Sequence, residues 1–175
     1  MANDPNWRLP EVPSFSLSSP DFEHGGELPA WSRGDGPGAE NRSPALAWAG
    51  APEGTRSFVL TMFDPDAPTS SGWWHWAVAN LPASTTALPQ GAGDPDAGLL
   101  PAGAVTIANE SRIEAYFGAA PPPGHGEHRY FFTVSALDAE QLEVPAGATP
   151  AMLGFIMREH VIGRAQLVGV TETPA

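Results

Sequence analysis

Proline and glycine interrupt almost every segment of this chain, which contains 20 prolines and 19 glycines among 175 residues. Proline lacks the backbone donor that helices and central strands need, and glycine destabilises helix interiors, so both favour turns between short elements. The pattern predicts a mainly β protein. Because an apolar sheet needs a second layer, we expect a two-sheet antiparallel β-sandwich with one or two short helices near the C-terminus. The length suits a single domain over residues 1–175.

Alternating and apolar runs place the individual elements. The expected strands cover residues 45–48, 57–63, 73–80, 104–108, 129–136 and 165–170. Residues 1–14 are expected to form an irregular N-terminal arm, and residues 82–103, rich in Gly, Pro and Asp, a long surface loop. Apolar residues at helical spacing predict a helix over residues 150–160, with Thr149 as its cap and Pro150 at its first position.

Composition excludes several kinds of chemistry, because the chain contains no cysteine and all eight of its basic residues are arginine. Thiolate nucleophiles, disulfides, thiolate metal sites, Schiff bases and a phosphate-loop lysine are therefore absent. The formal net charge of −12 opposes binding to nucleic acid and to anionic lipid surfaces. No apolar run approaches the roughly 20 residues of a spanning helix, so we expect no transmembrane segment and a cytoplasmic location.

The segment 58–82, FVLTMFDPDAPTSSGWWHWAVANLP, carries the first candidate site residues. Proline disfavours continuation of a strand, so Asp64 is expected at a strand end, where its carboxylate leaves the sheet plane. Asp66 is expected either to form the turn that follows, by bonding its own backbone, or to contact a ligand. Strand alternation predicts that one face of the next strand carries Trp73, His75, Ala77 and Ala79, and the other Trp74, Trp76, Val78 and Asn80. A carboxylate and an imidazole beside a tryptophan indicate one wall of a pocket.

The segment 116–136 carries the second set, in a Pro-Gly loop that leads into an aromatic strand. Alternation puts His128, Tyr130, Phe132 and Val134 on one face of this strand. Three prolines, at positions 121–123, fix the loop, so the backbone N–H groups of residues 118–120 are expected to be held in place. Fixed N–H groups and imidazoles suit an oxyanion. His125, between two glycines, is expected to be a solvated loop residue.

Several ordered motifs now carry a family resemblance. They are Asp-Pro-Asp-Ala-Pro at 64–68, His-Trp at 75–76 with Asn-Leu-Pro at 80–82, Tyr-x-Gly at 116–118, and His-Arg-Tyr at 128–130. With them the chain resembles the phosphatidylethanolamine-binding proteins, in particular their bacterial Raf-kinase-inhibitor-like branch, over roughly residues 15–170. It departs from the pattern of the bacterial relatives at residues 109–112 and at Ala119-Ala120.

The resemblance implies a β-sandwich whose small pocket binds phosphate-like anions, including the phosphatidylethanolamine head group, without catalysis and without a cofactor. By position, the ligand-binding residues would be Asp64, Trp73, His75, Gly118, Pro122, His128 and Tyr130, with Asp66 and Pro68 shaping the turn. We hypothesise that His75 and His128 donate N–H groups to the anion while Asp64 orients one imidazole. Tyr130 would add a hydroxyl donor.

Other readings of the same residues stay open. Two histidines and Asp64 form a possible ligand set for a metalloenzyme. A serine hydrolase is disfavoured, because the chain has no Gly-x-Ser-x-Gly turn. Members of the resembled family also act through their surfaces, by binding protein kinases or inhibiting serine proteases, which makes such proteins alternative partners. Exposed aromatic or strand-edge surface would favour a homodimer.

Overall fold

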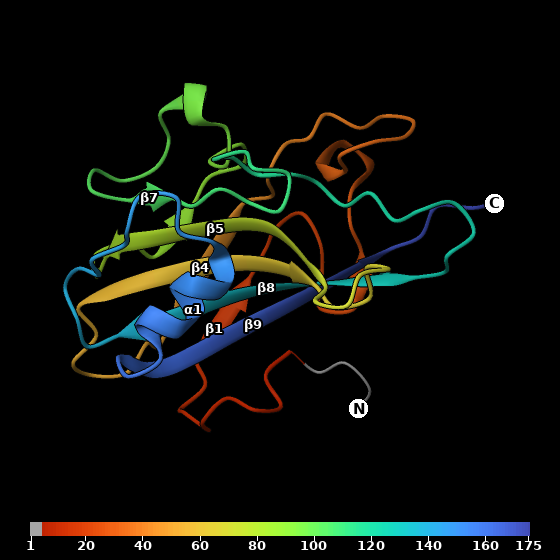
Figure 1. The fold of residues 1–175 in the computed structure, drawn as a ribbon. Coiled ribbons are helices and arrows are strands. Elements are labelled where there is room, and N and C mark those ends of the chain that lie inside the picture. The colour runs from red at the N-terminus through yellow and green to blue at the C-terminus, as the bar shows by residue number, and fades with distance from the viewer. Residues whose placement is uncertain (1–4) are drawn as a thin grey trace.

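The computed structural model describes residues 5–175, and Figure 1 shows its ribbon. Within these residues the strands form two sheets, one of six strands in the order β2-β9-β8-β4-β5-β7 and one of three in the order β1-β3-β6. The small sheet consists of β1 (Ser16–Ser18), β3 (Leu46–Ala49) and β6 (Ala87–Leu88). The large sheet consists of β2 (Gly26–Glu27), β4 (Ser57–Asp64), β5 (Trp73–Pro82), β7 (Val105–Thr106), β8 (His128–Leu137) and β9 (Val161–Thr171). The helix α1 spans Pro150–Met157, and short 3-10 turns occupy Ala30–Ser32 and Pro95–Ala97.

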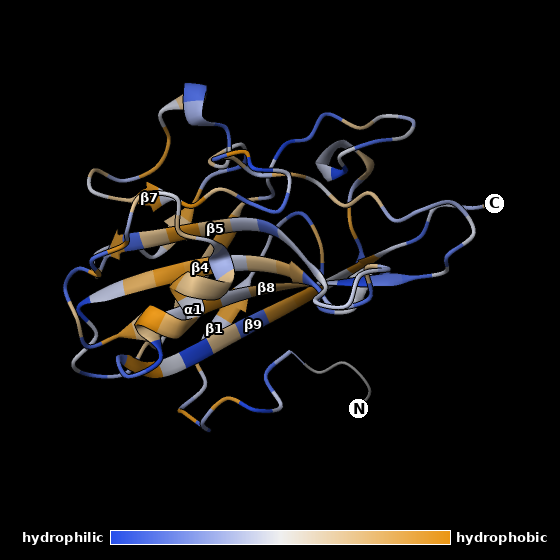
Figure 2. Ribbon diagram, in the orientation of Figure 1, coloured by the Kyte–Doolittle hydropathy of each residue, from blue (hydrophilic) through white to orange (hydrophobic). Residues whose placement is uncertain are grey.

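The main core lies on the inner face of the large sheet. Buried side chains of β4, β5 and β8, among them Leu60, Trp76 and Phe132, pack in one cluster with Leu46 and Trp48 of the small sheet. A second cluster lies on the outer face, under α1. Figure 2 shows the corresponding hydrophobic colouring along the central strands and α1. The inner face of the central strands is thus covered by the small sheet and the outer face by α1. Each apolar face is therefore buried under a second layer, as a stable sheet requires.

The predicted mainly β, two-sheet fold with a C-terminal helix is confirmed. All six predicted strands are present, although the strand expected at 104–108 is reduced to two residues. The helix ends at Met157, three residues before the predicted end at 160, and β2 pairs with β9 in parallel, so the pairing is not purely antiparallel. The first four residues of the predicted arm lie outside the described part of the chain.

The short strands β1, β2 and β6 were not predicted. In particular, β6 lies inside 82–103, for which a loop without elements was expected, and it pairs with β3 through Leu88 opposite Leu46. That prediction was therefore wrong. The pairing depends on the burial of these two leucines against the core and not on any local pattern, since two residues carry no periodicity.

A β-bulge in β5 changes which way His75 faces. Met62 of β4 lies opposite Trp76 whereas its neighbour Phe63 lies opposite Trp74, so His75 is an extra residue in the ladder. Trp76 packs in the inner core, and the ring of Trp74 packs against Phe63 at a centroid distance of 4.3 Å. A bulge of this kind interrupts strand alternation and re-aims a side chain.

The predicted grouping of His75 with Ala77 and Ala79 is accordingly wrong. These two alanines belong to the outer cluster under α1. The ring of His75 instead meets the ring of Tyr130 at a centroid distance of 5.2 Å, and Tyr130 belongs to the inner core. On β8, which has no such irregularity before Ala136, the predicted common face of Tyr130, Phe132 and Val134 is confirmed.

Candidate functional site

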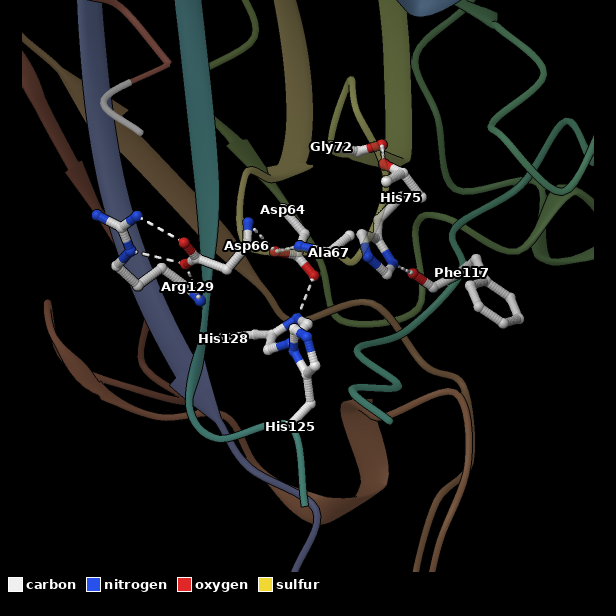
Figure 3. A network of polar contacts seen from close by, with 10 residues as sticks. Asp64, Asp66, Ala67, Gly72, His75, Phe117, His125, His128 and Arg129 are labelled. Atoms are coloured by element: carbon white, nitrogen blue, oxygen red, sulfur yellow. Dashed lines mark hydrogen bonds and ion pairs between the residues drawn. The ribbon is translucent and has the colours of Figure 1, made fainter. Parts of the chain in front are cut away.

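The site begins at Asp64, where β4 ends as predicted before Pro65. One carboxylate oxygen, Oδ1, accepts the backbone N–H groups of Asp66 at 2.8 Å and Ala67 at 3.0 Å. The other, Oδ2, lies 2.7 Å from Nδ1 of His128. Only 3% of Asp64 is exposed, so both oxygens have exchanged water for protein donors. Figure 3 shows this carboxylate at the centre of the polar network.

His128 opens β8 and is held at both ring nitrogens. A carboxylate only accepts, so Nδ1 of His128 carries a proton and donates it to Asp64. The opposite nitrogen, Nε2, lies 2.7 Å from Nδ1 of His125. The two rings meet edge to face at a centroid distance of 4.9 Å, and Figure 3 shows them together at this end of the network. The prediction for His125 was incomplete: the residue is exposed, but its ring covers His128. Figure 1 shows the loops after β4 and before β8 at the same end of the large sheet.

His75 faces the same region from β5, in a fixed tautomer. Its Nδ1 lies 2.8 Å from the carbonyl oxygen of Phe117, and because a carbonyl only accepts, this nitrogen carries the proton. Burial lowers the pKa of His75 from 6.5 to about 4, although the Phe117 carbonyl and the charge of Asp64 favour protonation. The ring is neutral near pH 7, and Nε2 is therefore an acceptor. Donation from His75 to an anion would need a second proton on the ring or another tautomer, and the donor role stays a prediction.

Two buried polar atoms of the site have no hydrogen-bond partner within the described residues. They are Nε2 of His75 and the hydroxyl oxygen of Tyr130, and the indole Nε1 of the neighbouring Trp73 is a third nearby. The Tyr130 hydroxyl lies beside the backbone of Ala120, but too loosely for normal hydrogen-bond geometry. Burial raises the pKa of Tyr130 above its usual value, and the charge of Asp64 raises it further, so the hydroxyl keeps its proton and is a donor.

Gly118 and Pro122 make contacts with the protein itself that support the site. The N–H of Gly118 donates to Oδ1 of Asn41 at 2.7 Å, so it is not available for an anion, contrary to expectation. A Cβ atom at Gly118 would lie 2.3 Å from the carbonyl oxygen of Ser32, which explains the glycine. Pro122 is exposed, and its carbonyl accepts the N–H of His125 at 3.1 Å, which forms the turn that carries the His125 ring.

Asp66 and Pro68 lie in the turn after β4. The Asp66 carboxylate accepts three hydrogen bonds from Arg129. Nε and a terminal nitrogen of the side chain each donate at 2.7 Å, and the backbone N–H donates at 3.1 Å. The hydrogen bond from the Arg129 side chain lowers the pKa of Asp66. The predicted role of Asp66 is thereby refined: it ties the turn to β8, while Asp64 accepts the N–H groups of the turn. Pro68 is exposed at the outer end.

Comparison with known proteins identifies the family. Residues 18–172 match the sequence profile described as "Phosphatidylethanolamine-binding protein". The chain belongs to the phosphatidylethanolamine-binding protein family. It is 47% identical to the UPF0098 protein YbhB of Escherichia coli over 89% of this chain and 99% of YbhB. It is 41% identical to YbcL of the same organism over 93% of this chain and 90% of YbcL.

A solved structure agrees with the sequence relatives. The crystal structure of E. coli YbcL, described as a new member of the mammalian PEBP family, superimposes with a TM-score of 0.86 at 40% identity, covering 91% of this chain and 98% of that one. The chain thus belongs to the YbhB/YbcL branch of the family, as the motifs indicated. The departures noted at 109–112 and 119–120 leave the fold intact.

Sequence reasoning missed three contributors to the candidate site. His125 covers His128, the Phe117 carbonyl sets the tautomer of His75, and Asn41 holds Gly118. The spacing His125-x-x-His128 was a usable signal for the first; the other two depend on contacts between distant segments. Within residues 5–175 no three His, Cys, Asp or Glu side chains are grouped to hold a metal ion. The same residues contain no helix long and apolar enough to cross a membrane.

Proposed function

We propose that this protein is a non-enzymatic binding protein for small phosphate-like anions or phosphoesters, held between His75, His128 and Tyr130 beside Asp64. The observation that carries the proposal is the pair of unpartnered buried atoms, Nε2 of His75 and the hydroxyl of Tyr130. Leaving a buried polar group unsatisfied costs about 1–3 kcal/mol. The two atoms belong to rings whose centroids lie 5.2 Å apart, which favours a polar ligand that supplies both missing hydrogen bonds.

Binding requires the site to open. Asp64, His75 and His128 are each no more than 3% exposed, and Tyr130 has no exposed surface. His125 is the exposed member, and the glycines on either side of it, Gly124 and Gly126, have φ angles of 72° and 90°. An incoming anion would take the place of the His125 ring at Nε2 of His128.

His128 would then present Nε2 to the ligand. Its Nδ1–H donates to Asp64, so the ring is held with Nε2 toward the position of the His125 ring. A proton taken up at Nε2 turns that nitrogen from an acceptor into a donor for an anion oxygen. Asp64 thus has the orienting role that the sequence suggested, on His128 and not on His75.

An NMR titration of the histidine ring signals with O-phosphorylethanolamine tests the proposal. His75→Ala and His128→Ala assign the two site rings, and His160, a half-buried residue bonded to Asp138 at 2.9 Å, is the internal control. We expect saturable shifts for His75, His128 and His125, with His160 unchanged. Absence of any shift at the three rings up to millimolar ligand would refute the proposed function.

A further inference from the structure

We propose that a cavity on the outer face of the large sheet binds a fatty acid, with its carboxylate on Arg164 and its hydrocarbon chain between α1 and the N-terminal arm. None of the residues of the anion site described above lines this cavity. The inference is therefore independent of the proposed function.

The cavity lies between three parts of the fold. Its volume is about 440 Å³, within the range of about 300–1,000 Å³ that is usual for small-molecule pockets. The sheet contributes the aromatic rings of Phe63, Trp74 and Phe131, and α1 and the described part of the arm contribute the two walls. Figure 1 shows α1 in front of the large sheet and the arm on the side of β9. A mainly apolar lining of this size suits a hydrocarbon chain.

Gly154 of α1 keeps one wall open. Glycine is unfavourable in the interior of a helix, and a Cβ atom at Gly154 would meet no other atom within 4 Å. The residue lines the cavity, so a larger side chain at this position would project into the space. Gly154 thus offers a way to fill the cavity without a backbone clash.

The charges around the cavity have one sign. The chain has 20 acidic residues and a formal net charge of −12, yet no Asp or Glu is among the described residues that line the cavity. Its two ionisable lining residues, within that part of the chain, are Arg158 and Arg164. An apolar space with only positive charge at its border is complementary to an apolar molecule that carries a negative head group.

Arg164 is the arginine that needs a partner. Five other arginines form ion pairs with carboxylates, namely Arg33, Arg42, Arg56, Arg129 and Arg158. Arg8 and Arg112 are exposed, whereas Arg164 is half-buried and pairs with no carboxylate of the described residues. Burial without a counter-charge lowers the pKa of Arg164.

The hydrogen bonds of Arg164 leave most of its donors for a ligand. A guanidinium has five N–H donors, and the side chain of Arg164 donates one long bond, 3.5 Å, to the carbonyl oxygen of Pro10 in the arm. Glu11 lines a neighbouring hollow that Arg164 also borders, but forms no ion pair with it. A carboxylate matches the fork of a guanidinium and can accept two parallel hydrogen bonds from it.

Arg158 has a different part at the rim. It donates to the Phe155 carbonyl oxygen at 2.7 Å and to Glu159 at 2.8 Å, and its guanidinium lies 4.0 Å from the centre of the Phe155 ring. Its charge is already paired. One free arginine favours a head group with a single negative charge, which a fatty acid has above its pKa.

Calorimetry at pH 8 with three ligands of equal chain length tests the proposal. They are decanoate, decan-1-ol and decylammonium, each below the concentration at which it forms micelles. We expect decanoate to bind saturably and about ten- to a hundredfold more tightly than the alcohol, because it gains charged hydrogen bonds to Arg164. Decylammonium should bind more weakly than the alcohol. The indole N–H signal of Trp74 and the methyl signal of Met157, both at the cavity, should shift with decanoate.

Three variants locate the binding. Arg164→Gln should reduce the advantage of decanoate over the alcohol to within a few fold of unity. Arg42→Gln changes the net charge equally but lies outside the cavity, so it should keep the full advantage. Gly154→Leu should fill the cavity and abolish binding of both ligands, and an unchanged circular dichroism spectrum would show that it is folded.

Several outcomes would overturn the proposal without affecting the anion site. They are absence of saturable decanoate binding, full decanoate affinity in Arg164→Gln, and shifts at His75 and His128 in place of Trp74 and Met157. A dimer in sedimentation experiments that Gly154→Leu dissociates, together with no decanoate binding, would assign the cavity to a second copy of the chain instead. Decanoate binding that is lost in both Arg164→Gln and Gly154→Leu supports the fatty-acid site.

Discussion

The buried neutral state of His75 should make the stability of the protein depend on pH in a defined window. Burial lowers the pKa of His75 to about 4 in the folded protein, from 6.5 in the unfolded chain. Between these values the unfolded chain binds a proton that the folded protein does not. Stability is therefore fully present above about pH 6.5 and falls as the pH decreases toward 4.

The size of the effect follows from the two pKa values. The full difference corresponds to about 3 kcal/mol, of which about 2 kcal/mol is lost between pH 7 and pH 5. His75 is 3% exposed, so solvent screening does not reduce this figure appreciably. The perturbation that isolates it is His75→Asn, because asparagine cannot titrate and its amide can still donate to the Phe117 carbonyl.

The assay is equilibrium unfolding in guanidinium chloride at pH 7, 6 and 5 for the wild type and His75→Asn. Other groups titrate in both proteins, so the quantity of interest is the difference between them. We expect the free energy of unfolding of the wild type to fall by about 2 kcal/mol more than that of the variant from pH 7 to pH 5. The control His24→Asn, which removes an exposed histidine, should retain this component. Parallel curves for wild type and His75→Asn would refute the fixed neutral state of His75 and weaken the argument for an acceptor at Nε2.

Three further predictions concern the cover and the supports of the site. His125→Ala removes the ring bonded to His128. Calorimetry should show O-phosphorylethanolamine binding about two- to tenfold more tightly, because one competing hydrogen bond is lost. Weaker binding would mean that His125 is a ligand contact. Gly118→Ala should lower the free energy of unfolding by about 1–3 kcal/mol, because its Cβ would lie 2.3 Å from the Ser32 carbonyl oxygen. The control Gly154→Ala, in α1 with open space around it, should raise the free energy of unfolding by about 0.5–1 kcal/mol. Equal effects of the two substitutions in denaturant unfolding would contradict the clash. Asp66→Asn should destabilise the protein by about 1.5–3 kcal/mol at pH 7, because it removes the ion pair with Arg129. The loss of stability should become smaller as the pH falls below 3.8, because the pKa of Asp66 is lowered in the folded state and the wild type also loses the ion pair on protonation. A loss of stability that does not change with pH in thermal unfolding scans would count against the ion pair as its cause.

The parts of the fold and site that the sequence predicted correctly are those governed by local rules. The end of β4 at Asp64 follows from Pro65, and the inward face of Tyr130 and Phe132 follows from regular alternation along a paired strand. The face of His75 was predicted wrongly because a bulge is a property of the register between β4 and β5, which residues of one strand do not reveal. The strand β6 was missed for a related reason, since its two residues are ordered by burial against β3.

The bulge also explains how two consecutive residues of β5, His75 and Trp76, both face the inner side of the large sheet. In a regular ladder His75 and Trp76 would face opposite sides, and either the imidazole or the indole would leave the inner side of the sheet. The extra residue lets the ring of Trp76 meet that of Tyr116 in the core at a centroid distance of 5.6 Å. His75 at the same time reaches the carbonyl of Phe117, the residue that follows Tyr116. The same two residues, Tyr116 and Phe117, therefore fix both the packing of the core and the tautomer of His75. A substitution that restored regular alternation at His75 would move the imidazole away from Tyr130, so loss of anion binding in a stably folded variant of this kind would trace function to the register of β5.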